Sequence, residues 1–309
     1  MIVSAVMLLG RAAGLPAARR AKRLAEDAAE TAHPARLTVI SARPCFPASG
    51  GAEILLRVAD DPDAFVRLRV DRAPPAVAQV RDAVDEALAA AARWRALSAA
   101  LRQGGHEVHA LGRVVADPWI TAAPSNDTVE DLLSGLQECL AGRQPDVLPV
   151  AVMIADPAVL RALPRDRDPS LPTLLRLNAA RRLAALSGRR PYYRASFGAQ
   201  GSPEMSIVHP FALWQRYEAA VTASATAWLA GALPGTGVSA VMSRTRLVPG
   251  RVDRVRVHVV FHECPQQPHP PQGNHALAAT TDLDGTFVGD PTVLRDIRDA
   301  TGPLHLPPL

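Results

Sequence analysis

The sequence predicts an α+β protein made of two α/β-sandwich-like modules, with mainly antiparallel sheets and packed helices. Short runs with strand-like composition alternate with longer segments of helical spacing. The order strands, helix, strands occurs twice, over about 37–116 and 190–263. The composition agrees with this prediction, because 48% of the 309 residues are apolar and 21% are charged, which is ordinary globular usage. A chain of this length can build two cores.

The pattern along the chain predicts four segments. An apolar and basic helix occupies 1–35, and the first module occupies 36–145. The second module covers 146–263, and 264–309 form a proline-rich loop, a hairpin and a short C-terminal helix.

The first module opens with three β-type runs followed by a long helix. The runs lie at 37–41, 53–58 and 64–70, separated by turn-rich stretches. The helix follows Pro74–Pro75 and stops at Gly104–Gly105. Its apolar residues recur at near-helical spacing and form one face to pack on the strands: Val77, Val80, Val84, Leu88, Trp94, Leu97 and Leu101.

The first module closes with two short runs, which return to the sheet, and a second helix. The helix is expected over 127–141, with Asp127 as its N-cap and Gly142 as its stop.

The second module begins with a buried strand and a proline-rich loop. The strand is expected at 148–155, and the loop at 156–172 has at most short helical turns. A helix over 171–187, ended by Gly188, leads to strands at 192–197 and 205–208. Pro210 then opens a helix over 211–230 whose apolar stripe is expected in the core: Trp214, Tyr217, Val221 and Trp228.

The best-defined unit is an antiparallel hairpin. Its strands, 238–248 and 251–263, flank a turn at Pro249–Gly250. Alternation in the second strand places Val257, Val259 and Phe261 on the core face. The other face carries Arg254, Arg256, His258 and His262, so we expect it to be basic and exposed.

The N-terminal segment joins an apolar run to a basic cluster. Residues 1–10 are apolar, and Arg19 to Arg23 are mostly basic. The simpler interpretation is an amphipathic helix over about 1–30 that packs on the body of the protein. The alternative is an anchor on an anionic membrane surface through residues 1–25, and a truncated hydrophobic helix would give the same pattern.

Compartment is inferred from the order of these charges and from the cysteines. The positive charges follow the apolar run instead of preceding it, which disfavours a secretory signal. Cys45, Cys139 and Cys264 are widely spaced and fit no disulfide framework. We therefore expect a cytoplasmic protein, or one at the inner face of the membrane.

A second basic stretch predicts anion binding. Residues 171–200 hold six arginines and no acid, and Tyr192 and Tyr193 lie among them. Guanidinium groups suit phosphates, carboxylates or an acidic partner, whereas nucleic acid is disfavoured. A solvated face paired with Asp166 and Asp168 is the alternative. The predicted anion-binding residues are Arg181, Arg182, Arg189, Arg190 and Arg194.

The motifs that define metal, cofactor and phosphotransfer sites are not matched. His262, Cys264, His269 and His275 could supply a tetrahedral zinc set, but they lack standard ligand spacing, so no metal is predicted. The chain has neither a glycine-rich phosphate loop nor a nucleophile elbow, so no cofactor is predicted. Residues 282–286 spell a phosphotransferase signature, D-x-D-G-T, but they follow Ala-Ala-Thr-Thr and predict a hairpin turn.

These features favour a non-enzymatic intracellular binding or assembly protein with a protein partner. The alternative is an enzyme acting on a phosphorylated or carboxylated substrate. In that case Arg189, Arg190 and Arg194 would bind the anion, and His258 or His262 would be the general base.

Overall fold

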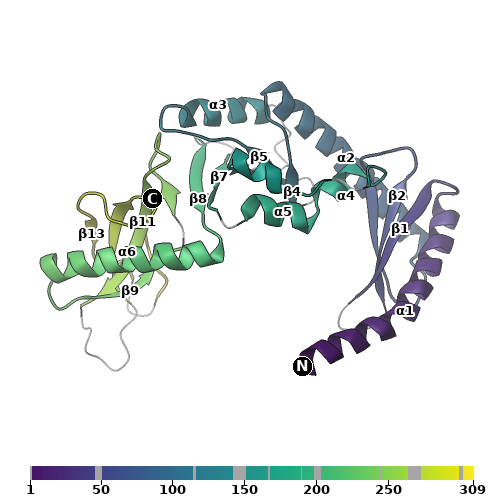
Figure 1. Cartoon of the computed structure of the whole chain (residues 1–309), viewed down its shortest axis with the longest axis horizontal. Helices are drawn as coiled ribbons and strands as arrows, with labels where there is room; N and C mark the ends of the chain where they lie inside the picture. Colours follow the sequence, from purple (N-terminus) through teal and green to yellow (C-terminus); the bar gives the residue numbers. More distant parts are fainter. Residues whose placement is uncertain are drawn as a thin grey trace. The chain divides into compact units, whose positions relative to one another are not determined.

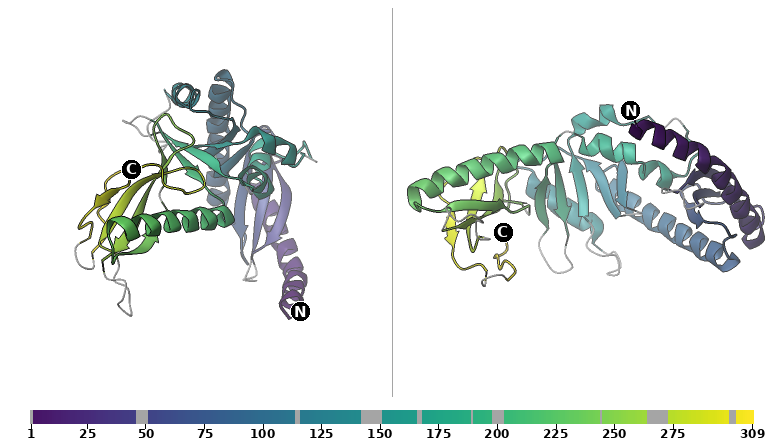
Figure 2. Two further views of the ribbon diagram at one scale, coloured as in Figure 1. Left: turned by 60° about the vertical axis from the view of Figure 1, so that its left-hand side comes forward. Right: turned by 90° about the horizontal axis from the view of Figure 1, so that it is seen from below.

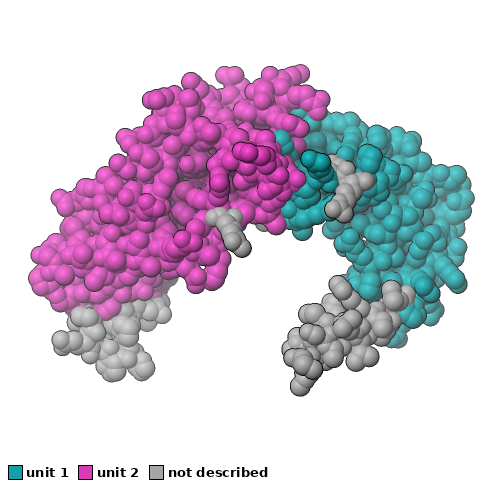
Figure 3. All heavy atoms as spheres, in the orientation of Figure 1, with its two compact units in different colours: residues 1–100, 109–116, 164–182 teal, residues 101–108, 117–163, 183–309 magenta. Residues whose placement is uncertain are grey.

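The chain divides into two compact units (Figure 3). Unit 1 comprises Met1–Ala100, His109–Ala116 and Pro164–Arg182, and unit 2 comprises Leu101–Val108, Asp117–Leu163 and Leu183–Leu309. The helices and mostly antiparallel sheets of the chain confirm the predicted α+β class. The computed structural model describes residues 2–45, 51–113, 116–141, 151–165, 168–188, 190–197, 203–243, 245–263, 273–298 and 302–309, and side chains from residue 16 onward.

Unit 1 contains an antiparallel three-stranded sheet in the order β1–β2–β3. The strands confirm the three predicted runs and comprise β1 (Leu37–Pro44), β2 (Ala52–Val58) and β3 (Phe65–Val70). Helix α1 (Ile2–Ala32) lies against this sheet (Figure 1). Small side chains allow the helix to lie close to the strands, and those buried on α1 are Ala18, Ala21, Ala25, Ala28, Ala29 and Ala32.

The basic cluster of α1 points to solvent. Arg19, Arg20, Lys22 and Arg23 are all exposed, and Lys22 pairs with Glu26 at 3.6 Å. The apolar side chains at the start of α1, on which the anchor hypothesis depends, lie outside the described side chains. Among the described helices, none combines the length and the apolar character needed to cross a membrane.

Helix α2 (Val77–Gln103) confirms the predicted long helix. Val77 and Leu88 are half-buried, and the rest of the predicted apolar face is buried: Val80, Val84, Trp94, Leu97 and Leu101. On another face Arg95 bonds to Asp61 at 3.0 Å and Asp63 at 3.2 Å, which joins α2 to the β2–β3 loop.

The single helix predicted over 171–187 is wrong, because two helices occupy this range. They are α4 (Thr173–Leu177) and α5 (Ala180–Ser187), with Asn178 between them. Asn178 is the C-cap of α4, and both its amide and its side chain donate to the Leu174 carbonyl, at 3.0 and 2.7 Å. The predicted end of α5 at Gly188 is confirmed, with φ of 38° there.

Unit 2 contains a sheet in the order β5–β6–β7–β8, and strand β4 (Ala110–Arg113) lies in unit 1. Strands β5 and β6 are parallel, and the other two pairs are antiparallel. The bounds are β5 (Ala116–Thr121), β6 (Ala151–Ala155), β7 (Tyr192–Ser196) and β8 (Glu204–Val208). The loop predicted after β6 has one short helical turn, η1 (Pro157–Ala162).

Helix α3 (Val129–Leu140) confirms the second predicted helix, but its predicted cap is wrong. The N-cap residue is Thr128, and no side chain caps the helix. The Thr128 hydroxyl instead accepts from the Ser125 amide at 2.9 Å, which holds the entry turn. The predicted stop, Gly142, lies outside the described residues.

A second sheet of unit 2 contains the predicted hairpin, with an interruption in its first strand. Its order is β10–β11–β12–β13, and β9 also pairs with β11. Helix α6 (Phe211–Ala232) runs along this sheet (Figure 2). The strands are β9 (Gly237–Val241), β10 (Arg246–Leu247), β11 (Val255–His262), β12 (His275–Thr281) and β13 (Thr292–Leu294).

The second face of β11 is buried, so the predicted exposed basic face is wrong for both histidines. Val257, Val259 and Phe261 are fully buried as predicted, but His258 and His262 are only 4% and 5% exposed. Apolar side chains near the C-terminus pack against Val260 on the histidine face, namely Leu294, Ile297, Leu304 and Leu306. Leu294 ends β13, Leu304 and Leu306 lie outside helices and strands, and the described part of 273–309 has no helix where a short C-terminal helix was predicted.

Helix α6 buries only part of its predicted stripe. Tyr217 and Val221 are buried, whereas Trp214 and Trp228 are partly exposed. The turn predicted in 282–286 is confirmed, because Asp282 N–H donates to the Thr286 carbonyl at 2.9 Å and Gly285 has φ of 95°.

Candidate ligand-binding site

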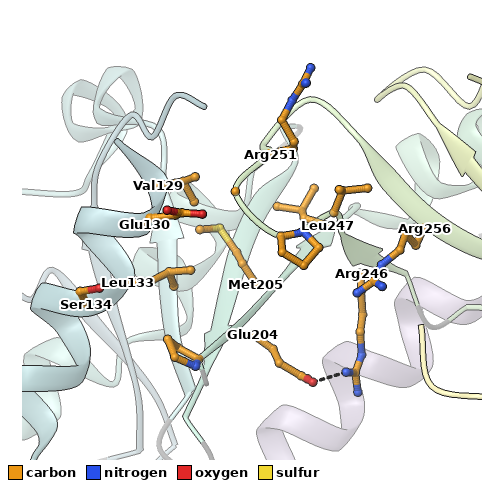
Figure 4. A pocket seen from close by; sticks show the side chains of 14 residues that line it. Val129, Glu130, Leu133, Ser134, Glu204, Met205, Arg246, Leu247, Arg251 and Arg256 are labelled. Carbon is orange, nitrogen blue, oxygen red and sulfur yellow. Dashed lines mark hydrogen bonds and ion pairs between the residues drawn. The ribbon is translucent and has the colours of Figure 1, made fainter. Parts of the chain in front are cut away.

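A pocket of about 610 Å³ lies in unit 2 between α3, the start of β8 and the β10 turn (Figure 4). We call it the α3 pocket. Much of its wall is apolar, which is typical of small-molecule sites. The apolar side chains come from all three elements and include Val129, Leu133, Met205, Leu247, Val248 and Pro249.

The β10 turn is held in place by its own conformation and by α3. Pro249 and Gly250 form a turn closed by the Arg251 N–H to Val248 carbonyl bond of 2.9 Å. Gly250 has φ of 70°, which glycine adopts without strain. Asn126, just before α3, accepts from the Val252 amide at 2.9 Å. The conformation of the Pro249–Gly250 turn and the hydrogen bond to Asn126 therefore hold this wall of the pocket in place.

Two arginines face each other at one end of the pocket. Arg246 of β10 and Arg256 of β11 are partners in the antiparallel register, and Figure 4 shows them side by side. Like charges directly opposite on paired strands repel each other. Glu204, at the start of β8, forms an ion pair with Arg246.

Arg256 has no such compensation. It forms no ion pair with any residue in the described part of the chain. Its Nε is buried and has no hydrogen-bond partner there. This end of the pocket therefore carries two guanidinium groups against one carboxylate, and an anion would balance the charge.

Glu130 lies across the pocket from the arginines (Figure 4). It is exposed, and its carboxylate lies next to Gly250: a Cβ built on Gly250 would be 2.8 Å from Glu130 Oε1. The pocket therefore has a positive end and a negative rim, with apolar walls between them. Arg251 also lines the pocket, but its guanidinium pairs with Asp253 at 2.7 Å. An anionic group therefore fits best at the end that Arg246 and Arg256 form.

The predicted anion-binding arginines do not form one cluster. Arg181 is exposed, Arg182 donates to the His109 carbonyl at 3.4 Å, and Arg190 pairs with Asp156 at 3.0 Å. Arg189 lies outside the described residues. Of the four described arginines, Arg194 alone lines either the α3 pocket or a second pocket of unit 2, which lies on the exposed face of β7 and β8.

The two candidate general bases lie away from both pockets. His258 is buried on β11, and burial lowers the pKa of its imidazole. His262 Nδ1 bonds to the Ser239 hydroxyl at 2.8 Å. Neither pocket is lined by His258 or His262.

The weak metal candidates form no metal site within the described residues, where no group of three or more histidine, cysteine or acidic side chains is close enough to hold an ion. His275 Nδ1 accepts from the Asp296 amide at 3.1 Å, and its Nε2 is 3.5 Å from Glu263. Cys264 and His269 lie outside the described residues.

Comparison with protein families, curated proteins and solved structures finds no match for this chain. The inference of function therefore depends on the geometry of the two pockets.

Sequence reasoning placed Arg256 on a basic face but missed Glu204 and Arg246 as its neighbours. Glu204 and Arg246 come from different sheets, so no local pattern relates them. Only the register of the hairpin places Arg246 opposite Arg256, and the turn residues alone do not define that register.

Proposed function

We propose that the protein is a ligand-binding protein whose α3 pocket holds a small amphipathic anion. The ligand carries a carboxylate or phosphate group on an apolar tail. The observation that carries the proposal is Arg256, a guanidinium at the pocket end with no carboxylate partner among the described residues. Charged hydrogen bonds of this kind contribute about 1.5–3 kcal/mol each.

The apolar walls support a tail. Met205 and Leu247 are 6% and 5% exposed, so they present a fixed surface, while Leu133 of α3 is half-buried and faces them across the pocket. Transfer of a methylene from water to such a surface contributes about 0.8 kcal/mol. A ligand that spans from the arginines to α3 gains both the charged hydrogen bonds and the burial of its apolar tail.

Binding is favoured over catalysis by the position of the histidines. A general base must reach the substrate within hydrogen-bond distance or through one water. His258 and His262 line neither pocket, so the enzyme that combines them with the arginines has no support from the site.

Calorimetric titration with octanoate, octanol and butanoate tests the proposal. We expect octanoate to bind at least about tenfold more tightly than octanol, which lacks the charge, because 1.4 kcal/mol corresponds to a factor of ten. Butanoate lacks four methylenes and should also bind at least about tenfold more weakly. Equal affinity for octanoate and octanol would contradict a role for the arginines.

A further inference from the structure

The exposed face of β7 and β8 forms the floor of a second pocket, of about 750 Å³, which we call the β7–β8 pocket. Arg194 and Ser196 of β7 lie opposite Ser206 and Glu204 of β8 in register, so these four side chains share one face. The remaining walls come from the β9–β10 segment and from the start of α6, and include Ser243, Thr245, Arg246, His209 and Trp214.

The β7–β8 pocket carries one uncompensated positive charge. Arg194 is exposed and pairs with no acid in the part of unit 2 that the structure describes. Arg246 is already paired with Glu204. Burial lowers the pKa of His209, so its imidazole is neutral at neutral pH. The charge of Arg194 therefore selects an anion.

Hydroxyl groups beside Arg194 indicate which anion. Ser206 and Thr245 already donate to the backbone carbonyls of Arg194 and Ile207, at 3.4 and 3.3 Å. The hydroxyls of Ser196 and Ser243 bond to no described residue. One guanidinium edge satisfies the two oxygens of a carboxylate, whereas a phosphate monoester has a third oxygen for a hydroxyl.

Trp214 closes the pocket at one end with a partly exposed ring. Its ring centre is 5.7 Å from that of Tyr217 and 6.4 Å from that of His209, so neighbours hold it in place. Val208 is two residues beyond Ser206, or about 7 Å along β8. Arg194, Val208 and Trp214 line the same pocket, so a ligand that fills it can contact both the guanidinium and the indole. Aromatic faces bind flat ligand surfaces.

We infer that the β7–β8 pocket binds a phosphate monoester of a ring-bearing alcohol, such as a sugar phosphate. The phosphate binds Arg194 with Ser196 and Ser243, and the ring packs on Trp214. This site adjoins the α3 pocket, with which it shares Glu204, Met205 and Arg246. The two sites differ in the residues that select the ligand, because Arg194 and Trp214 line only the β7–β8 pocket, whereas Arg256 and Leu133 line only the α3 pocket.

Titration of the full chain with ribose 5-phosphate, ribose and inorganic phosphate tests the inference, with calorimetry and tryptophan fluorescence as readouts. We expect ribose 5-phosphate to bind more tightly than inorganic phosphate, and ribose at least about tenfold more weakly than ribose 5-phosphate. Arg194→Gln should weaken ribose 5-phosphate binding at least about tenfold. Arg190→Gln is the matched control, because Arg190 pairs with Asp156 and lies outside the pocket, and it should leave the affinity unchanged.

One further variant and one further ligand separate the parts of the inference. Trp214→Phe should abolish most of the fluorescence change and reduce the preference for ribose 5-phosphate over inorganic phosphate. Arg194→Gln should leave octanoate binding intact, so failure here is distinguishable from failure of the α3 pocket. The inference is overturned if the wild-type chain binds no ribose 5-phosphate, or if Arg194→Gln binds it as well as the wild type. Equal affinity for ribose 5-phosphate and inorganic phosphate would overturn the assignment of the ring to Trp214.

Discussion

Arg246 and Arg256 face each other across the β10–β11 pair, and Glu204 neutralises only Arg246. Paired strands normally avoid like charges in this position, because the repulsion is not repaid by packing. The arrangement is understandable if an anion occupies the α3 pocket beside Arg256.

Removing the charge of Glu204 should strengthen anion binding in the α3 pocket. Glu204→Gln keeps the shape of the side chain but leaves Arg246 uncompensated, so the arginine end becomes more positive. Exposed charge pairs contribute up to about 1 kcal/mol, so we expect octanoate affinity to rise about two- to fivefold. Glu138→Gln, on exposed α3 surface, is the control and should have no effect. A weaker affinity in Glu204→Gln would show that Glu204 itself holds the ligand.

Gly250→Ala should destabilise unit 2. The residue has φ of 70°, and a Cβ there would lie 2.8 Å from Glu130 Oε1. The left-handed conformation costs a residue with a Cβ about 1–2 kcal/mol. We expect a loss of that size in the free energy of unfolding by urea. Gly235→Ala is the control for backbone strain alone, since its φ is 88° and nothing described lies within 4 Å of the added Cβ. If Gly250→Ala lost no more stability than Gly235→Ala, the contact between the turn and α3 would be unimportant.

Stability should fall at alkaline pH through Tyr217. Burial raises the pKa of this phenol from 10.0 to about 12. Its hydroxyl is 2.9 Å from the Thr281 hydroxyl, which itself donates to the Asp282 carbonyl, so Tyr217 is the donor. The raised pKa means that the fold favours the neutral phenol, and this contribution is complete below pH 10 and lost as the pH rises toward 12.

The Tyr217→Phe variant separates the pH-dependent contribution of Tyr217 to stability from the contributions of the other tyrosines. Tyr192 and Tyr193 also have pKa values raised by burial, so the wild-type curve contains all three. Urea unfolding across the alkaline range should show a shallower loss of stability in Tyr217→Phe than in the wild type. At neutral pH the variant should be less stable by about 1 kcal/mol, through the lost hydrogen bond. Parallel curves would show that Tyr217 does not titrate in this window.

The alternative that residues 1–25 anchor the protein on an anionic membrane surface makes a prediction about the basic cluster of α1. Arg19, Arg20, Lys22 and Arg23 are exposed opposite the buried alanines, and each basic side chain near such a surface contributes about 1 kcal/mol. Replacing all four by Gln should weaken flotation with phosphatidylserine vesicles by at least about a hundredfold. The binding should also fall with added salt. Arg67→Gln with Arg69→Gln, both exposed on β3, is the control. Equal and negligible flotation of the wild type and the fourfold variant would contradict membrane binding by α1.

The elements that sequence patterns predicted are those whose burial repeats with the period of the structure. Strands β1 to β3 and helices α2 and α6 follow from apolar spacing alone, because that spacing determines which face is buried. The break at Asn178 could not be predicted from spacing, since it depends on a side chain that bonds back to Leu174. The burial of Val260, which lies between His258 and His262 on β11, involves a distant C-terminal segment that no local pattern relates to it.

The candidate site was hidden by the register of the hairpin. A two-residue turn at Pro249–Gly250 would place Arg246 opposite Asp253, a favourable pair. Instead the Val248 amide donates to the Arg254 carbonyl at 3.0 Å, so the loop is longer and Arg246 meets Arg256. Asp253 is held by Arg251 through two bonds of 2.8 and 2.7 Å. These contacts determine the length of the loop, and the number of residues between the two strands does not predict them.

The affinity for octanoate of Arg256→Gln, compared with that of Arg254→Gln, tests the central claim most directly. Both variants remove one charge from the same stretch of chain, but Arg254 lies beside Asp253 and does not line the α3 pocket. We expect Arg256→Gln to bind octanoate at least about tenfold more weakly than the wild type, and Arg254→Gln to bind it unchanged. Equal affinities in the two variants would contradict the proposal that Arg256 holds the anion.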